Sequence, residues 1–121
     1  MAHDRNHHQI SYIEFTAPDI QKAKKFYTKA FHWTFQDWGP DYISFSAYEA
    51  GLSGGFRRTE PGQTTGEAAP LVVLYTSDLK ATEAAIVAAS GIITVPTFEF
   101  PGGRRFHFSD GVGNTLAVWS E

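Results

Sequence analysis

Tyr12 and Glu14 are the two residues whose types and spacing best suit acid–base chemistry. They stand two positions apart in the alternating run 9–16, so in a strand they share one face, while Ile13 and Phe15 share the other. On the wall of a cleft, a carboxylate is able to act as a general base and a phenol as a general acid. We therefore predict Glu14 and Tyr12 as catalytic candidates. The alternative for Glu14 is a half-exposed strand residue or an ion-pair partner.

His107 and two arginine pairs are the next candidates. His107 lies between Phe106 and Phe108, so in a strand it faces away from them, toward a cleft or toward solvent. We predict it as a ligand-binding residue, and the alternative is an ordinary surface or hydrogen-bonded histidine. The pairs Arg57–Arg58 and Arg104–Arg105 suit recognition of an anionic ligand such as a carboxylate. The alternative, which the exposure typical of arginine favours, is that these are solvated strand ends.

The composition excludes several classes of function. The formal net charge is -3 and no run of Lys or Arg exceeds a pair, so neither nucleic acid nor a membrane surface is expected as a partner. The chain has no cysteine, which excludes disulfides and thiolate chemistry. It has no apolar stretch of about 18 residues and no signal-peptide pattern. We expect a soluble, cytoplasmic protein.

A repeated segment must position these residues. Residues 10–33 and 69–92 each contain an apolar run, an aspartate suited to cap a helix, and an amphipathic helical pattern. The capping aspartates are Asp19 and Asp78. His32 stands at the end of the first helix, and Gly91 stands where the second needs a left-handed residue to stop. A repeat of this kind implies two equivalent modules, with any functional cleft where they meet.

Each half continues with runs typical of strands. We expect strands within 34–57, including one over Tyr42–Tyr48, and three more at 92–97, 105–109 and 115–120. The segment 58–69 lacks apolar periodicity and collects Gly, Pro, Thr and Glu, so it is predicted to be a linker. The prediction is one domain over 1–121, made of module 1 (residues 9–57) and module 2 (residues 70–120). Each module is a strand, a helix and three strands.

This order, with particular residues, resembles the vicinal oxygen chelate superfamily, which contains glyoxalase I, bleomycin-resistance proteins and extradiol dioxygenases. The matching pieces are Ala17–Pro18–Asp19, Phe26–Tyr27, Ala30–Phe31–His32–Trp33, Ser77–Asp78–Leu79 and the segment from Phe108 to Leu116. His32 departs from the glycine usual in relatives. The resemblance implies an α+β fold in which two βαβββ modules pair into a half-open barrel. It also implies a ligand in the concave cleft and a homodimer.

The resemblance further implies four metal-ligand positions in the cleft. They fall on Tyr12, Leu71, Ala117 and a position near Gly54–Gly55–Phe56. Leu, Ala and Gly side chains cannot coordinate a metal, and a phenol must first lose a proton whose pKa is about 10. We therefore expect no metal and no other cofactor. A divalent ion held through Glu14 and His107 remains the alternative.

The side chains on the expected cleft faces are mostly apolar and aromatic, which suits a flat or hydrophobic small molecule. With His107, the predicted ligand-binding residues are Tyr12, Leu71, Val73, Tyr75, Ala117 and Trp119. The alternative is that these side chains fill the space between the sheets or pack a dimer interface.

Three functions stay open at this point. The first, which we favour, is metal-independent binding of a small hydrophobic or aromatic molecule. The second is a lyase, isomerase or dioxygenase-type enzyme acting on a small oxygenated substrate, with or without a metal. The third is a structural or regulatory module with a filled cleft.

Overall fold

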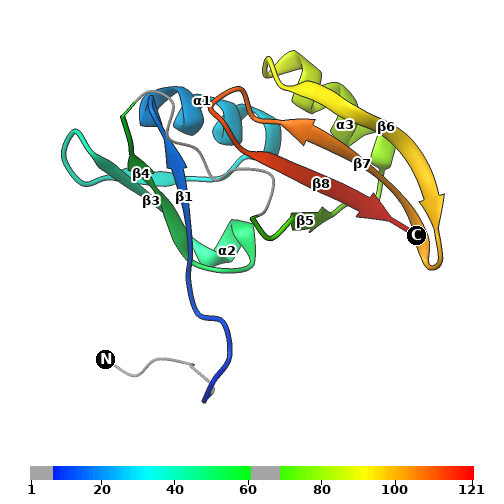
Figure 1. The fold of residues 1–121 in the computed structure, drawn as a ribbon, viewed down its shortest axis with the longest axis horizontal. Coiled ribbons are helices and arrows are strands. Elements are labelled where there is room, and N and C mark those ends of the chain that lie inside the picture. Colours follow the sequence, from blue (N-terminus) through cyan, green and yellow to red (C-terminus); the bar gives the residue numbers. More distant parts are fainter. Residues whose placement is uncertain (1–6, 61–68) are drawn as a thin grey trace.

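The computed structural model describes residues 7–60 and 69–121 and contains two four-stranded sheets at opposite ends of the molecule (Figure 1). Module 1 consists of β1 (Ile13–Ala17), α1 (Ile20–Phe31), β2 (Phe35–Asp37), β3 (Tyr42–Phe45), α2 (Ala47–Ala50) and β4 (Gly54–Arg58). Module 2 consists of β5 (Val72–Tyr75), α3 (Leu79–Ala88), β6 (Ile92–Phe100), β7 (Gly103–Ser109) and β8 (Thr115–Ser120).

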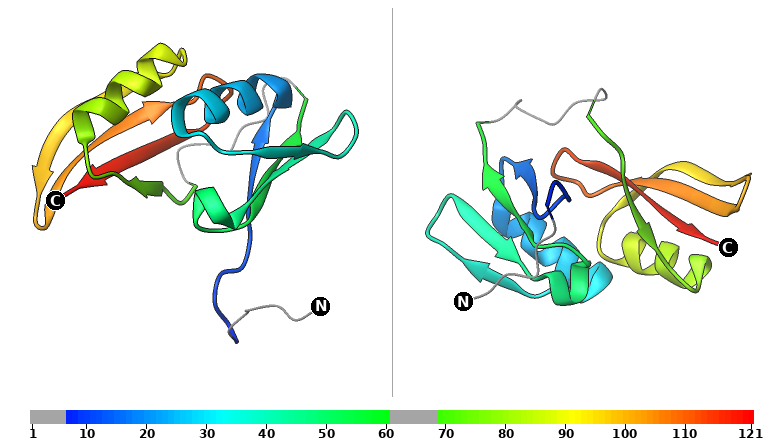
Figure 2. Two further views of the ribbon diagram at one scale, coloured as in Figure 1. Left: turned by 180° about the vertical axis from the view of Figure 1, so that it is seen from behind. Right: turned by 90° about the horizontal axis from the view of Figure 1, so that it is seen from below.

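Both sheets have the same topology. The strand order is β1-β4-β3-β2 in module 1 and β5-β8-β7-β6 in module 2. In each, the first strand pairs in parallel with the last, and the other pairs are antiparallel. The sheets do not close into a barrel, and from below they stand apart (Figure 2). The predicted α+β fold of two βαβββ modules in a half-open arrangement is confirmed.

The capping aspartates act as the sequence predicts. Asp19 accepts a hydrogen bond from the Lys22 backbone N–H at 3.1 Å, and Asp78 accepts one from that of Ala81 at 3.1 Å. Each therefore satisfies a backbone donor that the first turn of a helix leaves free. His32 ends α1 in the left-handed conformation, with φ of 61°.

The role assigned to Gly91 is wrong. Helix α3 ends one position earlier, and Ser90 takes the left-handed conformation with φ of 75°. Gly91 instead allows close packing between the helices. A Cβ there would lie 2.6 Å from Cγ2 of Ile86 and 2.7 Å from Cε1 of Phe26.

The strand expected over Tyr42–Tyr48 is also wrong in its second half. It stops at Phe45, and Ser46 caps the short helix α2 by accepting a hydrogen bond from the Tyr48 backbone N–H at 3.0 Å. The local serine bond therefore overrides the strand pattern. In module 2, β6 extends past the expected end to Phe100, with register shifts on either side of Val95. As an edge strand it tolerates Pro96 within this irregular stretch.

One hydrophobic core joins the modules beneath the helices. Module 1 contributes Phe15, Ile43 and Phe56, and module 2 contributes Phe106, Phe108 and Leu116, all buried. The ring centroids of Phe26 on α1 and Phe108 on β7 are 6.0 Å apart. Because both sheets turn one face to this core, their opposite faces point outward. We refer to these as the open faces.

A buried hydrogen-bond network also crosses between the modules at the β7–β8 loop. The hydroxyl of Tyr27 on α1 donates to the carboxylate of Asp110 at 2.8 Å. The same carboxylate accepts from the backbone N–H groups of Val112 and Asn114 and from the Asn114 side chain, at 2.9, 3.1 and 2.9 Å. Asn114 also donates to the carbonyl of Thr16 at 2.9 Å. These bonds tie module 2 to the first helix and strand of module 1.

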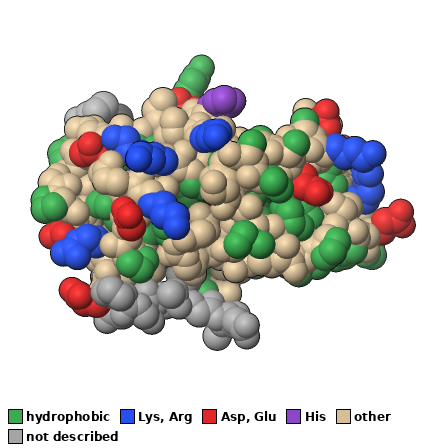
Figure 3. Space-filling view, turned by 90° about the horizontal axis from the view of Figure 1, so that it is seen from above, with side chains coloured by type: hydrophobic (Ala, Val, Ile, Leu, Met, Phe, Trp, Pro, Cys, Tyr) green, Lys and Arg blue, Asp and Glu red, His purple; other side chains and the backbone are tan. Residues whose placement is uncertain are grey.

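Helices α1 and α3 lie side by side on one side of the molecule. Seen from that side, Lys and Arg side chains gather over the α1 half, and hydrophobic side chains are prominent over the α3 half (Figure 3). No helix in the described ranges is long and apolar enough to cross a membrane. Most of the predicted linker 58–69 lies outside the described residues, although Arg58 itself belongs to β4.

Candidate functional site

Two cross-strand rows of side chains form the open face of module 2. The first row places Trp119 between Tyr75 and Arg105, with Phe98 beyond Arg105. The second row, one pleat away, contains Val73, Ala117, His107 and Val95. Six of the seven predicted ligand-binding residues therefore belong to module 2, since Leu71 directly precedes β5.

Aromatic rings in the first row, together with the neighbouring Phe100, lie around the guanidinium group of Arg105. The ring centroids of Tyr75 and Trp119 are 5.2 Å apart, and those of Phe100 and Trp119 are 6.3 Å apart. The guanidinium carbon of Arg105 lies 5.2 Å from the ring centroid of Phe98 and 5.5 Å from that of Phe100. Both distances fall within cation–π range.

A small hollow opens at this place. Its volume is about 360 Å³, and it is lined by Val73, Phe100, Pro101, Gly102, Arg105 and Trp119. The lining is mostly apolar with one charged group, which is the usual composition of a small-molecule site.

Two nitrogens on this face lack partners. Nε of Arg105 and Nε2 of His107 are both buried, and neither has a hydrogen-bond partner in the described structure. Burial, assisted by the positive charge of Arg105, holds the pKa of His107 below its ordinary value. The imidazole is therefore neutral at neutral pH, and Arg105 provides the positive charge of the pair.

The open face of module 1 holds a chain of polar side chains. Tyr12 Oη and Tyr42 Oη are 2.6 Å apart, and the Tyr42 hydroxyl donates to Oε1 of Glu14 at 3.0 Å. Nε of Arg57 lies 3.5 Å from Oε2 of Glu14. Partial burial and the hydrogen bonds with Tyr12 and Glu14 raise the pKa of Tyr42 well above its ordinary value. Tyr42 thus stays a neutral phenol between Tyr12 and Glu14.

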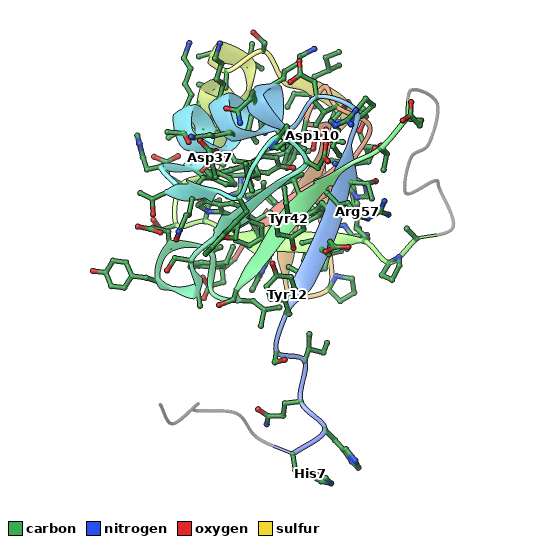
Figure 4. The ribbon with its side chains drawn as sticks, turned by 90° about the vertical axis from the view of Figure 1, so that its left-hand side faces the viewer. His7, Tyr12, Asp37, Tyr42, Arg57 and Asp110 are labelled. Atoms are coloured by element: carbon green, nitrogen blue, oxygen red, sulfur yellow. The ribbon has the colours of Figure 1, made fainter. Side chains whose placement is uncertain are left out.

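The two open faces point in different directions within one chain. Viewed from the module 1 end, β1 and β4 stand in front with Tyr12, Tyr42 and Arg57, and module 2 lies behind (Figure 4). The structure therefore brings Tyr12 and Glu14 together but separates them from the six predicted residues of module 2. Several of those six are open to solvent: Leu71 is 40% exposed, Val73 41% and Tyr75 56%. Ala117 is the exception and is fully buried within its row.

The strand register identifies the fourth metal-ligand position implied by the family resemblance. Gly55 pairs with Glu14 as Ala117 pairs with Val73, so Gly55 and Ala117 are equivalent. The four positions thus contain Tyr12, Leu71, Gly55 and Ala117. Their only donor atom is the Tyr12 hydroxyl, which is already hydrogen-bonded to Tyr42. This set does not fit a divalent cation, which needs several converging oxygen or nitrogen donors.

The rest of the described chain offers no substitute for that set. No group of three or more His, Asp or Glu side chains within residues 7–60 and 69–121 is placed to hold a metal ion. Glu14 and His107, the alternative ligands, lie on different open faces.

The sequence reasoning missed several residues of these faces. The sequence pattern predicts a strand at Tyr42 but does not identify Tyr42 as a site residue. Its alternation with the apolar Ile43 nevertheless places it on the same face as Glu14. Phe98 lies beyond the expected end of β6, and Val95 lies between the two register shifts, so counting in twos from Ile92 fails to place Val95 on this face. The alternation of β3 was a usable signal, whereas the irregularity of β6 has none in the sequence.

Two further hollows lie within the described residues. One, of about 870 Å³, lies between α3 and the strands on the helix side of module 2 and includes Lys80, Glu83 and Arg104. The other, of about 340 Å³, lies between module 1 and β5, is lined mainly by core side chains and reaches Val73 and Tyr75 at the edge of the open face. Neither is lined by Trp119, Arg105 or His107.

Comparison with known structures finds the same fold in several proteins. A glyoxalase-related enzyme from Fulvimarina pelagi has a TM-score of 0.77 and 17% identity, with 94% of this chain and 88% of that chain covered. The fosfomycin resistance protein FosX from Listeria monocytogenes, in a complex with Mn(II) and a dihydroxypropylphosphonic acid, has a TM-score of 0.76 and 17% identity, with 94% and 90% covered. TioX from Micromonospora sp. ML1 has a TM-score of 0.71 and 20% identity, with 93% and 98% covered. At these identities the likeness concerns the fold.

No curated protein sequence matches this chain. The model of the Glyoxalase/Bleomycin resistance protein/Dioxygenase superfamily, however, matches residues 9–118, which include both open faces. This match agrees with the doubled βαβββ topology and with the resemblance seen in the sequence motifs. The chain belongs to the glyoxalase/bleomycin resistance protein/dioxygenase superfamily.

Proposed function

We propose that this protein binds a small hydrophobic or aromatic molecule, without a metal, against the open face of module 2. The observation that carries the proposal is the aromatic hollow around Trp119 and Phe100, which is open to solvent. Burying an aromatic ring there would remove apolar surface of both partners from water.

The donor set at the four family positions supports metal independence. Leucine, glycine and alanine offer no ligand atom, and Tyr12 already shares a hydrogen bond with Tyr42. Binding therefore rests on ring packing and hydrogen bonds made by the chain itself.

We also propose that a second copy of the chain completes the cleft. Each chain has one polar open face and one apolar open face, and these point apart, so a symmetric pair would place module 1 of each copy over module 2 of the other. This arrangement would cover Val73 and Val95, which are 41% and 37% exposed in the single chain. Sedimentation should show a dimer, and Val95→Glu should shift it toward monomer. A wild-type monomer at high concentration would contradict this part of the proposal.

A titration tests the binding proposal. Chelator-treated protein, with metal content checked by elemental analysis, is titrated with naphthalene carboxamide, a flat neutral aromatic probe, and tryptophan fluorescence is followed. We expect a saturable change that disappears in Trp119→Phe and persists in Trp38→Phe, because Trp38 lies on module 1 beside Ser44. Binding that needs an added divalent ion would contradict metal independence, and no binding with or without metal would contradict the proposal itself.

A second candidate function is metal-free proton transfer. The chain of hydrogen bonds from Tyr12 through Tyr42 to Glu14 favours it, because it links a phenol at the surface to a carboxylate base. If the protein is a lyase or isomerase of this kind, Glu14→Gln should lower turnover of a small oxygenated substrate by about 10²-fold or more and leave ligand affinity nearly unchanged. Equal turnover in Glu14→Gln and wild type would remove this candidate.

A further inference from the structure

Arg105 stands out among the charged side chains of the two open faces because its charge is not balanced. On module 1, Arg57 is paired with Glu14 and Arg58 with Asp41. Arg105 instead lies against the rings of Phe98 and Phe100, and its buried Nε has no acceptor within the described ranges. Aromatic faces attract a guanidinium, but they do not accept its N–H groups in the way that an anion does.

Among the described residues, no carboxylate forms an ion pair with Arg105. Glu121, at the end of β8, is the acidic side chain placed near the aromatic row, and its carboxylate accepts a hydrogen bond from the Tyr75 hydroxyl at 2.6 Å. Tyr75 and Arg105 flank Trp119 on opposite sides, so this bond holds Glu121 at the Tyr75 end of the row.

His107 adds a second unsatisfied nitrogen close by. It stands two positions along β7 from Arg105, on the same open face, and its Nε2 is also buried without a partner. A buried polar atom left without a hydrogen bond destabilises the folded state. Two such atoms, one on a cation, beside a hollow of about 360 Å³ indicate that the missing partner is a ligand.

We propose that the ligand of this face is an aromatic anion, a flat ring that carries a carboxylate or a similar acidic group. The ring packs in the hollow against Trp119 and Phe100, and the acidic group accepts hydrogen bonds from Arg105 and His107. A guanidinium fork pairs with a carboxylate through two parallel N–H···O bonds, which fixes the orientation of the ring as well as its affinity. This inference rests on the proposed function and adds the charge of the ligand and the residues that bind its acidic group.

The test compares two probes that share a ring and differ in charge: naphthalene carboxylate and naphthalene carboxamide. Both are titrated into the full-length, chelator-treated protein by calorimetry. An ion pair of this kind corresponds to a preference of roughly tenfold to hundredfold for the carboxylate. Arg105→Gln should abolish the preference by weakening the carboxylate alone, and Arg105→Lys should restore part of it.

Arg104→Gln is the matched control, because Arg104 is the neighbouring arginine on the same strand and faces the other side of the sheet. It should leave both affinities unchanged. Thermal unfolding of each variant checks that the fold is intact, and the carboxamide affinity provides the same check for the site.

The outcomes separate this inference from the proposed function. Equal affinity of the wild type for the two probes, or a carboxylate preference that survives Arg105→Gln, would overturn the charge assignment and leave aromatic binding standing. Absence of binding by both probes would overturn the proposed function and this inference together.

Discussion

Module 1 and module 2 pair their strands in the same order, yet equivalent positions on their open faces hold different chemistry. Glu14 of module 1 corresponds to Val73 of module 2, because each lies on the first strand beside the small residue of the last strand. By the same register Arg57 corresponds to Trp119, Tyr42 to Arg105 and Ser44 to His107. Module 1 is polar where module 2 is aromatic.

The two faces differ in whether their charged and hydrogen-bonding groups find partners within the same face. In module 1 the cation Arg57 meets Glu14, and Glu14 meets Tyr42, so the face is closed by its own hydrogen bonds and ion pair. In module 2 the cation Arg105 lies against rings, and two buried nitrogens have no hydrogen-bond partner among the described residues. One backbone topology thus carries a self-satisfied surface and an unsatisfied one, and the unsatisfied surface is the better candidate for binding a ligand.

The largest effect on stability should come from removing the hydrogen bonds that join the two modules. Asp110→Ala removes the acceptor for Tyr27 and for three further donors in the β7–β8 loop. Because these donors would lose a buried, charged acceptor, we expect the free energy of unfolding to fall by about 3–5 kcal/mol. Chemical denaturation measures it.

The control for Asp110 is Asp41→Ala, which removes an exposed ion pair with Arg58. It should change the stability far less, since exposed pairs contribute little. Asp110→Asn should destabilise as well, because its amide N–H groups would face donors. A loss in Asp110→Ala no larger than that in Asp41→Ala would show that the loop does not hold the modules together.

An intermediate effect should distinguish the two small residues at equivalent positions. A Cβ at Gly55 would lie 2.5 Å from the carbonyl oxygen of Ile43 and 2.6 Å from Oη of Tyr42. Gly55→Ala should therefore displace Tyr42 and cost about 1–3 kcal/mol of stability through overpacking. The reverse exchange, Ala117→Gly, should cost about 1 kcal/mol, because it adds only chain flexibility and a small void. Equal costs measured by denaturation would mean that Tyr42 does not need the glycine.

The smallest effect should be the pH dependence contributed by His107. Its pKa is lower in the folded protein than the ordinary value of about 6.5, because of burial and the charge of Arg105. Between these two pKa values the unfolded chain binds more protons, so stability is full above the ordinary value and falls as the pH decreases toward the folded value. His107→Gln should flatten the stability curve in that range. An unchanged slope would place the histidine in a more solvated position.

Much of the fold was predictable from local signals. Asp19 and Asp78 precede amphipathic patterns, and both cap helices as expected. Alternation placed Glu14 of β1 on the same side as Tyr12, which directly precedes the strand, and it placed His107 opposite the buried Phe106 and Phe108. Capping and alternation depend only on neighbours in the chain, so predictions made from them remain correct in the folded structure.

The parts that failed depend on contacts between distant segments. Gly91 is predicted to end the second helix, but a glycine is needed there because a Cβ would lie 2.7 Å from Cε1 of Phe26 on the other helix. The buried partner of Asp110 is Tyr27, which lies 83 positions away, so no local pattern indicates this bond. The unbalanced charge of Arg105 depends on which side chains reach it, which the sequence does not show.

The most direct test of metal-free aromatic binding by module 2 follows the indole N–H resonance of Trp119 by NMR. Chelator-treated protein is titrated with naphthalene carboxylate, and the resonance is assigned with Trp119→Phe. If module 2 binds the probe without a metal, this resonance should show a saturable shift that is the same before and after addition of zinc or magnesium. A resonance that stays in place at all probe concentrations, or moves only once a divalent ion is added, would contradict metal-free binding by module 2.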